Sequence, residues 1–415
     1  MNQPAVPPEV PLLEPITMSD LSTLGDRASK LIEYLREKTL IPDRSKMPPL
    51  ISADKVATYC GLTKGQMAYR IKNGAPAGTV TSRGGRREFT VEEAHAWARQ
   101  ERKGRLRPPG AKSAVCASCF FKGGVAKTTS AMNLAQGLSL LGHRVLNIDL
   151  DPQGSLSTLH GYQPDADVPY EETLGPLFDG AESDVRYCIG STYWPSIDLI
   201  RSSSALFAAE FHLPTRQRTE KDFQFWNVLN KGLDAVREEY DVIIMDTPPS
   251  LSYMTFNAFY AADGLLVPMM TNVLDIASSA QFWTLFGDYA ESIAKDRYDA
   301  NNNLVARGMP KDYDFVNILL SRVDNQESTT ESVRGLIKKV YMEKVLQVEI
   351  PETTVTRGKV NQFMTVFDIT RYEGDSRTYK RARDAYEAFA AAMEDSIRKV
   401  WARQLRDQQL SQKET

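Results

Sequence analysis

From residue 113 to the C-terminus, short apolar runs alternate with segments in which apolar residues recur at helical spacing. The runs have the length of strands, and their continuous apolar character is typical of strands that are buried on both faces. They lie at residues 114–121, 144–149, 197–201, 241–246, 264–270, 315–323 and 345–350. The pattern predicts an α/β fold with a doubly wound, mostly parallel sheet, whose ligands bind at the carboxyl ends of the strands.

Residues 51–97 carry a different, helical pattern. A short capped helix ends at Gly61, and Thr63 is placed to cap a second helix that runs through Met67 to Lys72. A Gly-Gly tip flanked by arginines then precedes a third helix with Trp97. This helix-turn-helix spacing, followed by a basic hairpin, favours DNA binding over a packing module. The candidate DNA contacts are Gln66, Tyr69, Arg70 and Lys72 on the second helix and Arg83, Arg86 and Arg87 on the hairpin.

The charge distribution supports nucleic-acid contacts in the first part of the chain. Residues 1–110 contain 18 Lys and Arg against 12 Asp and Glu, a balance of +6, which leaves −9 for the remainder of a chain whose formal charge is −3. A basic front on an acidic body favours DNA binding through the front. The basic run at residues 102–110 ends in Pro-Pro-Gly and predicts a linker that is first stiff and then flexible.

Other classes of protein are disfavoured by the composition. The four cysteines, Cys60, Cys116, Cys119 and Cys188, are too few and too scattered for a disulfide framework. Cys116 and Cys119 have a metal-ligand spacing, but residues i and i+3 of a strand point to opposite faces, so we expect core packing and no metal cage. No apolar run reaches 18 residues, and the Pro-rich N-terminus lacks the apolar core of a secretory signal, so a cytoplasmic protein is expected.

A candidate phosphate cradle lies between the first apolar run and the helix that follows it. The helix is predicted to start near Lys127, and backbone N–H groups of a glycine-rich turn that opens onto a helix can surround a phosphate. Lys127 would reach the β- and γ-phosphates, and the Thr128 hydroxyl would bind Mg²⁺. A strict Walker motif is absent, because Phe121 and Ala126 stand where it has glycine. The cradle comprises Lys122, Gly123, Gly124, Val125, Ala126, Lys127, Thr128 and Thr129.

This box, with its additional lysine, resembles the deviant Walker box of the ParA/MinD family. The resemblance implies an enzyme that hydrolyses ATP to ADP and phosphate with Mg²⁺, and a homodimer in which Lys122 reaches across to the partner's nucleotide. Ala126 replaces the commoner glycine of the family, and its additional Cβ near the phosphates would slow turnover.

Two further stretches resemble motifs of the same family, and each follows a predicted strand. By this resemblance Asp151, in an Asp-Pro-Gln sequence, orients the attacking water, and Asp246 supports the Mg²⁺ shell. Carboxylates are suited to these places, since phosphoryl transfer is catalysed by positioning and charge neutralisation more than by covalent chemistry. The implied catalytic residues are Lys122, Lys127 and Asp151; the implied metal-site residues are Thr128 and Asp246; and the implied adenine contacts are Pro351 and Glu352.

Residues 20–405 resemble the large ParA partition ATPases that carry an N-terminal helix-turn-helix domain, here of the MerR-like winged type. The resemblance implies a ParB-like centromere-binding partner and operator DNA that the N-terminal domain binds to repress its own operon. It also implies a nucleoid-associated ATP dimer that binds DNA without sequence preference and does not bind a membrane. The non-specific contacts would come from several basic residues together, Arg357, Arg377, Lys380 and Arg381.

Two long helices carry apolar stripes. The first is capped by Ser19 and Asp20 and ends before Pro42; its stripe packs against its own domain or, as in larger ParA proteins, against a second copy, and both uses stay open. The closing helix has a stripe that we expect to face the core rather than a membrane, because residues 406–415 are polar. The two stripes are Leu21, Leu24, Ala28, Leu31, Ile32, Tyr34 and Leu35, and Met393, Ile397, Val400, Trp401 and Leu405.

We therefore expect four segments: a tail and dimerisation helix at 1–46, a winged helix-turn-helix domain at 47–101, a basic linker at 102–112, and a ParA/MinD-like ATPase domain at 113–415. Two alternatives to partition stay open, an ATP-gated transcription regulator and a MinD-like membrane-cycling ATPase. An iron protein of the nitrogenase type is nearly excluded, because Cys188 stands alone in the middle of the ATPase domain.

Overall fold

The computed structural model describes residues 15–38, 46–80, 85–298, 304–306, 308–355, 363–370 and 374–414, and the chain divides into two compact units, residues 1–44 and 45–415. In the first unit one helix is described, α1 (Met18–Lys38). Thr17 caps it: the Thr17 hydroxyl accepts a hydrogen bond from the Asp20 N–H at 3.2 Å, and the Asp20 carboxylate accepts one from the Thr17 N–H at 2.8 Å. The predicted cap at Ser19 and Asp20 is therefore wrong, because Asp20 is the third helical residue of a capping box.

The apolar stripe of α1 is exposed. Leu21, Leu24, Leu31 and Tyr34 each leave more than half of their surface accessible. Where the structure describes its side chains, the apolar face of α1 is thus largely accessible.

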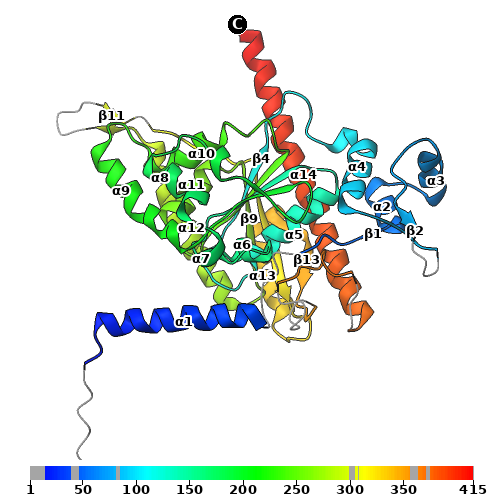
Figure 1. The fold of residues 1–415 in the computed structure, drawn as a ribbon. Helices are drawn as coiled ribbons and strands as arrows, with labels where there is room; N and C mark the ends of the chain where they lie inside the picture. Colours follow the sequence, from blue (N-terminus) through cyan, green and yellow to red (C-terminus); the bar gives the residue numbers. More distant parts are fainter. Residues whose placement is uncertain are drawn as a thin grey trace, which may run out of the picture. The chain divides into compact units, whose positions relative to one another are not determined.

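An eight-stranded sheet forms the centre of the second unit (Figure 1). All neighbouring strands are parallel except the last pair, which is antiparallel. In spatial order the strands are β13 (Val345–Pro351), β12 (Phe315–Val323), β9 (Gly264–Met269), β4 (Ala114–Ser118), β8 (Val242–Asp246), β5 (Val145–Asp149), β7 (Ile197–Ile200) and β6 (Gly190–Ser191). The predicted doubly wound, mostly parallel sheet is confirmed.

Alternate residues of the central strands face two separate hydrophobic cores. Cys116 belongs to the core that includes α5 (Lys127–Leu140) and α14 (Ser376–Glu414), whereas Cys119, just past the end of β4, belongs to the core on the other face. Both thiols are free and buried, and burial raises their pKa. The prediction that this cysteine pair packs in the core is confirmed.

The remaining helices lie around the sheet and its connections. They are α6 (Ser155–Leu159), α7 (Pro164–Asp167), α8 (Gly175–Asp179), α9 (Ala209–Thr219), α10 (Val228–Leu233), α11 (Tyr253–Ala261), α12 (Val273–Ala294) and α13 (Thr330–Tyr341), and a hairpin of β10 (Arg297–Tyr298) and β11 (Leu304–Ala306) follows α12. A 3₁₀ helix at Ser204–Ala208 continues directly into α9.

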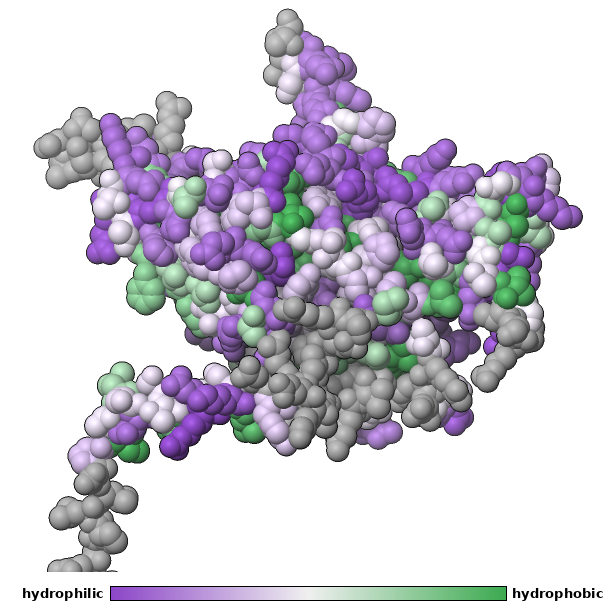
Figure 2. All heavy atoms as spheres, viewed as in Figure 1, coloured by the Kyte–Doolittle hydropathy of each residue, from purple (hydrophilic) through white to green (hydrophobic). Residues whose placement is uncertain are grey.

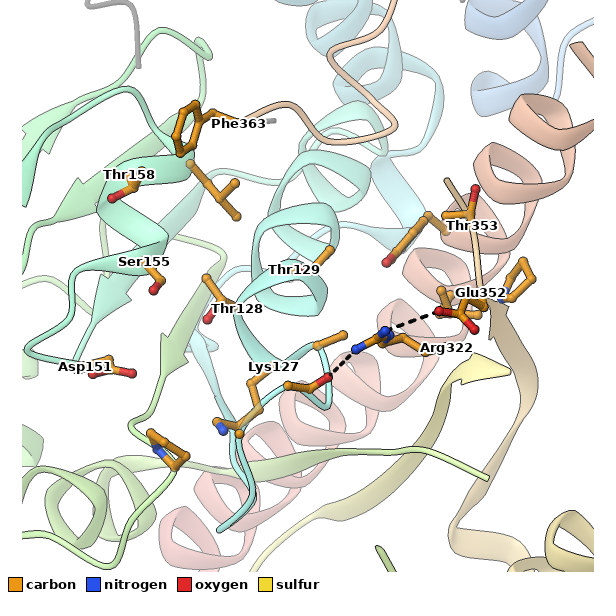
Figure 3. Close-up of a pocket in the computed structure, with 18 residues that line it drawn as sticks. Lys127, Thr128, Thr129, Asp151, Ser155, Thr158, Arg322, Glu352, Thr353 and Phe363 are labelled. Atoms are coloured by element: carbon orange, nitrogen blue, oxygen red, sulfur yellow. Dashed lines mark hydrogen bonds and ion pairs between the residues drawn. The ribbon is translucent and has the colours of Figure 1, made fainter. Parts of the chain in front are cut away.

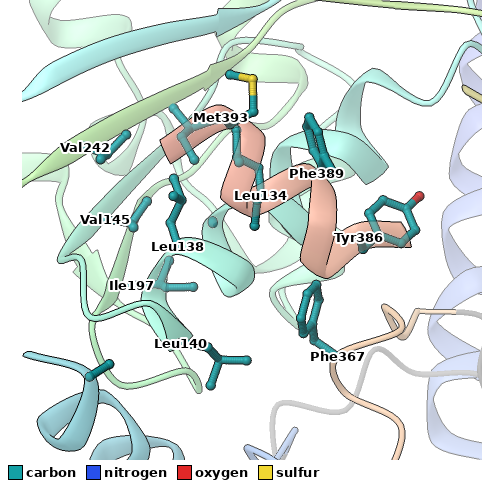
Figure 4. Close-up of a cluster of buried hydrophobic side chains, with 14 of the residues drawn as sticks. Leu134, Leu138, Leu140, Val145, Ile197, Val242, Phe367, Tyr386, Phe389 and Met393 are labelled. Atoms are coloured by element: carbon teal, nitrogen blue, oxygen red, sulfur yellow. The ribbon is translucent and has the colours of Figure 1, made fainter. Parts of the chain in front are cut away.

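Helix α14 packs along α5 and buries its apolar stripe there (Figure 4). Met393, Ile397, Val400 and Trp401 are fully buried or nearly so, so the prediction of a core-facing stripe is confirmed. The end of the helix beyond this stripe carries mostly hydrophilic side chains (Figure 2). Among the described helices, none is both long and apolar enough to cross a membrane.

Residues 51–101 form a small helical layer with a three-stranded sheet. Its elements are β1 (Ile51–Ser52), α2 (Ala53–Cys60), α3 (Lys64–Lys72), β2 (Thr79–Val80), β3 (Arg87–Phe89) and α4 (Val91–Glu101), with β3 central in the sheet. Ser52 caps α2, Gly61 ends it with φ 66°, and Thr63 caps α3, as the sequence predicts.

The basic run after α4 does not form the flexible linker that was predicted. Arg102 and Arg105 bind the carboxylate of Glu394 on α14 at 2.8 Å, and Arg107 pairs with Asp241 at 3.2 Å. Arg99 of α4 also pairs with Asp241, at 2.8 Å. Composition indicated a linker, but each of these arginines has a carboxylate on the acidic body within ion-pair distance, so the run fastens residues 46–112 to the sheet domain.

The contact between α5 and α14 gives a test of the fold. A Cβ added at Gly137 would lie 2.5 Å from the Cβ of Ala390, so Gly137→Ala should lower the free energy of unfolding by about 1–3 kcal/mol through overpacking. The improved helix propensity of alanine offsets this by at most about 1 kcal/mol. Gly335→Ala on α13 is the matched control, since its Cβ would have no neighbour within 4 Å. Urea denaturation of both variants measures the difference, and equal stabilities would contradict the packing described here.

Candidate nucleotide site

The turn between β4 and α5 has the backbone of a phosphate-binding loop. Gly124 and Ala126 adopt positive φ angles of 78° and 69°, and α5 begins immediately afterwards at Lys127. The left-handed conformation costs a residue with a Cβ about 1–2 kcal/mol. Ala126 therefore occupies a position that favours glycine, and the turn is held by its surroundings.

A cavity of about 640 Å³ opens beside this turn, at the carboxyl ends of the strands. Its size suits a small-molecule ligand. Figure 3 shows Asp151, Ser155, Thr158 and Phe363 on one side and Arg322, Glu352 and Thr353 on the other. Of the residues predicted for nucleotide binding, those that line the cavity are Gly123, Gly124, Ala126, Lys127, Thr128, Thr129, Asp151, Pro351 and Glu352, whereas Lys122, Val125 and Asp246 are not among its lining residues.

Lys127 lies at the base of the cavity and is nearly buried. Its ammonium donates a hydrogen bond to the carbonyl of Lys122 at 3.1 Å. Burial lowers the pKa of Lys127, and the nearby carboxylates of Asp246 and Asp151 partly oppose this effect. An ammonium in this position can receive an anionic group from the cavity.

Asp246 lies behind Thr128 at the end of β8 and is fully buried. Its Oδ2 accepts a hydrogen bond from the Thr128 hydroxyl at 2.6 Å, whereas its Oδ1 has no hydrogen-bond partner among the described residues. Burial, and then the charge of Asp149, raises the pKa of Asp246 well above its usual range. A carboxylate oxygen without a partner beside a hydroxyl fits the oxygen ligands that Mg²⁺ prefers.

Asp149, which the sequence analysis did not select, positions the loop that carries Asp151. One Asp149 oxygen accepts hydrogen bonds from the Ser157 N–H and hydroxyl, both at 2.8 Å, and the other accepts the Asp151 N–H at 3.2 Å. Burial raises the pKa of Asp149 to about 7, although the Ser157 hydrogen bonds oppose this. The sequence signal that could have identified Asp149 is that it is a carboxylate at the end of the strand that precedes Asp151.

Lys122 is not among the residues that line the cavity, and it forms an ion pair with Asp275 on α12. Asp275 is fully buried, and its other oxygen accepts a hydrogen bond from the Met270 N–H at 2.8 Å. In the single chain the lysine that the resemblance assigns to a partner's nucleotide is thus held within its own subunit.

The end of β12 supports the phosphate loop, a role that the sequence analysis did not assign. The Ser321 hydroxyl donates to the carbonyl of Val125 at 2.9 Å, and Arg322 donates to that of Gly124 at 3.1 Å. Arg322 also pairs with Glu352 at 3.2 Å, so it joins the phosphate loop to the segment that follows β13 (Figure 3). Its φ of 49° is unusual for a residue with a side chain.

The candidate DNA contacts lie outside this cavity, and some of them have other partners. The Gln66 side chain accepts hydrogen bonds from the Thr63 N–H and hydroxyl, and Arg70 pairs with Glu101 at 3.1 Å. Tyr69, which is 65% exposed, and Lys72 project from α3 into solvent. These two side chains are thus better placed than Gln66 and Arg70 to contact a partner of α3.

The basic residues predicted to contact DNA outside α3 also include side chains that are bound within the chain and side chains that are exposed. Arg87 donates to the carbonyl of Ala77, and Arg377 pairs with Asp375 at 3.3 Å. Arg86, Lys380 and Arg381 are exposed, and Arg83 and Arg357 lie outside the described residues. Within the described residues, no group of three or more His, Cys, Asp or Glu side chains is arranged to hold a metal ion by itself.

Comparison with known proteins places this geometry in a family. The "AAA domain" family model AAA_31 matches residues 113–297. The "Putative replication protein A" of Rhizobium rhizogenes is 32% identical over 78% of this chain and 80% of its own length. The chromosome partitioning protein ParA of Caulobacter vibrioides NA1000 is 30% identical over 57% of this chain and 80% of its own length.

Solved structures share the fold. A structure described as a partition protein superposes with a TM-score of 0.60 at 19% identity and covers 92% of this chain and 98% of that one. Cobyrinic acid a,c-diamide synthase from Mycobacterium smegmatis, solved with an ATP analogue and magnesium, gives a TM-score of 0.51 at 24% identity over 68% of this chain and 94% of that one. At these identities the likeness establishes the fold alone.

The raised pKa of Asp149 predicts a pH dependence of stability. Its folded pKa of about 7 exceeds the usual value near 3.9, so the folded state binds more protons between these values and the free energy of unfolding falls as pH rises from about 4 to 7. Each pKa unit is worth about 1.4 kcal/mol. Asp149→Asn should flatten this slope, whatever its effect on absolute stability. Urea titrations at several pH values without nucleotide or metal measure both slopes, and identical slopes would contradict the assignment.

Proposed function

Because the chain belongs to the ParA family of partition ATPases, we propose that it uses Mg·ATP in the cavity beside α5 to drive DNA segregation. The observation that carries this proposal is the meeting of Lys127, Thr128, Asp151 and Asp246 at the carboxyl ends of β4, β5 and β8. In this proposal the protein dimerises on ATP, binds nucleoid DNA without sequence preference and is stimulated by a ParB-like partner. It represses its own operon through residues 47–101.

Each residue at the cavity has a role that its position supports. The backbone N–H groups of the turn and the ammonium of Lys127 bind the β- and γ-phosphates. Thr128 and Asp246 would hold Mg²⁺, which would neutralise charge on the phosphates. Asp151 orients the water that attacks the γ-phosphate, and Asp149 fixes the loop of Asp151 through its backbone N–H.

Lys122 acts across the dimer in this proposal. In the single chain it is held by Asp275, so assembly of the dimer must break this ion pair before the ammonium can reach the partner's nucleotide. Hydrolysis then depends on dimerisation, since a catalytic cation arrives from a second copy. The exposed apolar face of α1 supports an additional contact between copies.

Substitution of the two lysines of this loop should therefore impair different properties of the protein. Lys127→Ala removes a direct phosphate contact, so it should abolish binding of Mg·ATP and Mg·ADP. Lys122→Ala should bind both nucleotides with nearly unchanged affinity but lose ATP-dependent dimerisation, with hydrolysis reduced by more than about 100-fold. Fluorescent-nucleotide titration, sedimentation and phosphate release measure the three properties. Normal hydrolysis by the Lys122 variant would refute the role across the dimer.

The layer of α2, α3 and α4 supports specific DNA binding. Its helix-turn-helix has capped helices and a tight turn at Gly61, and Tyr69 and Lys72 project from α3. The carbonyl oxygen of the Gln66 side chain is used in the cap and Arg70 is paired with Glu101, so we assign base and phosphate contacts to Tyr69 and Lys72 first. The exposed Lys380 and Arg381 at the start of α14 are the described candidates for non-specific binding.

An ATP-gated transcription regulator is a second candidate function that one observation favours. Residues 46–112 are fastened by ion pairs to α14, which also packs on α5, so the nucleotide state can influence the DNA-binding layer. A membrane-cycling role has less support, because the stripe that would enter a membrane is buried in the core.

The two proposed DNA surfaces should be separable. Tyr69→Ala with Lys72→Ala should weaken binding to the upstream region of the protein's own operon by about tenfold or more, since a good base contact is worth about 1–3 kcal/mol. ATP-dependent binding to random DNA should survive. Lys380→Ala with Arg381→Ala should show the reverse, with a shallower salt dependence of the remaining random-DNA binding. Filter binding or anisotropy on both DNAs decides, and affinities that always fall together would show a single surface.

A further inference from the structure

A buried lysine lies behind one wall of the nucleotide cavity. The side chain of Lys46 is only 11% exposed, and its ammonium donates hydrogen bonds to the carbonyls of Leu159 at 2.8 Å and Phe363 at 3.0 Å. Both of these residues line the cavity, Leu159 at the end of α6 and Phe363 in the segment before α14. One ammonium thus joins two parts of the same wall that are distant in sequence.

The third partner of Lys46 is Asp368, at 2.8 Å. An ammonium has three donors, so this side chain is saturated. The other Asp368 oxygen accepts hydrogen bonds from the Gln136 amide at 2.9 Å and the Tyr193 hydroxyl at 2.6 Å. Gln136 belongs to α5, so the network extends to the helix that starts at Lys127.

Burial of the Lys46 ammonium costs free energy, and only the contacts that it makes at this position compensate for that cost. Burial lowers the pKa of Lys46, and the charge of Asp368 opposes that effect. The ammonium also lies 4.5 Å from the centre of the Tyr193 ring. A buried ion pair is strongly destabilised when one partner is removed, because the other charge stays behind without compensation. The Lys46 contacts are therefore specific for this geometry of the wall.

The position of Lys46 in the chain gives the contact a further consequence. It stands two residues after the unit that contains α1, in the segment that leads from that unit into the body of the protein. A ligand whose binding stabilises the observed positions of Leu159 and Phe363 also stabilises the state in which Lys46 is hydrogen-bonded to their carbonyls. By linkage, release of Lys46 must weaken binding of that ligand by the same factor.

We propose that Lys46 is a positioning residue of the nucleotide site, which holds the Leu159 and Phe363 wall and through which nucleotide binding anchors the segment that leads to α1. The inference rests on the proposed function, in that the cavity binds an adenine nucleotide. It assigns Lys46 no contact with the nucleotide itself.

Lys46→Met tests the proposal, with Lys55→Met as the matched control. Lys55 also pairs with a carboxylate, that of Glu387 on α14, at 2.7 Å, but its partners do not line the cavity. We expect Lys46→Met to weaken Mg·ADP binding by about tenfold or more, a change of about 1.4 kcal/mol, and Lys55→Met to leave it nearly unchanged. Both variants lower thermal stability under a purely structural role, so the nucleotide affinity is the deciding measurement.

A second measurement uses the unaltered chain and does not depend on the folding of a variant. Trypsin cleaves after Lys46 only when its side chain leaves the Asp368 site, so the rate at which the fragment beginning at Met47 appears reports release. Saturating Mg·ADP should slow this cleavage several-fold, whereas cleavage after the exposed Lys72 on α3 should keep its rate.

The outcomes separate the two proposals. If the unaltered protein does not bind Mg·ADP, the proposed function fails. If it binds, but Lys46→Met binds equally well or Mg·ADP leaves cleavage after Lys46 unchanged, the cavity is a nucleotide site and the role of Lys46 is refuted.

Discussion

The ion pairs around Glu394 fix residues 46–112 on the body of the protein. This carboxylate of α14 is fully buried and receives hydrogen bonds from Arg102, Arg105 and His143. Burial alone would raise the pKa of Glu394, but the hydrogen bonds from His143 and Arg102 outweigh it and lower the pKa to about 2. Loss of a partner from such a buried charge costs about 3–5 kcal/mol. Since α14 also packs closely on α5, the layer of α2, α3 and α4 and the phosphate loop take their positions from one helix.

The strands and the phosphate loop could be predicted from the sequence because their signals are local. Continuous apolar runs mark strands that are buried on both faces, and a glycine-rich turn before a helix has few other uses. The partner of Lys122 could not be predicted in this way, because Asp275 is 153 positions away in the sequence. The partner of Gln66 could have been predicted, since Thr63 and Gln66 are three positions apart and form a capping box at the start of α3. Local pattern thus indicates partners within a few residues, whereas a partner far along the chain depends on tertiary packing.

The charge asymmetry of the chain shows the same limit of prediction from sequence. An excess of +6 in the first 110 residues is a sound indication of an anionic partner, but part of that partner is the chain itself. Arg99, Arg102, Arg105 and Arg107 are bound to Asp241 or Glu394, and Lys55 is bound to Glu387. The basic character of the front thus serves first to attach it to the acidic body. The argument for DNA binding then rests on the fewer side chains that project from α3 and the start of α14.

Lys46 and Lys122 are both bound to buried carboxylates, but the Lys46 contact is fixed and the Lys122 contact is movable. Lys46 has three acceptors for its three donors and is nearly enclosed, so it cannot move without leaving all of them. Lys122 is 26% exposed and has one acceptor among the described residues, Asp275, which keeps the Met270 N–H when the lysine departs. Departure still leaves a buried carboxylate without its cation, at a cost of several kcal/mol that the proposed dimer must offset. A lysine held by one such contact suits a step that occurs only when a nucleotide-bound partner arrives.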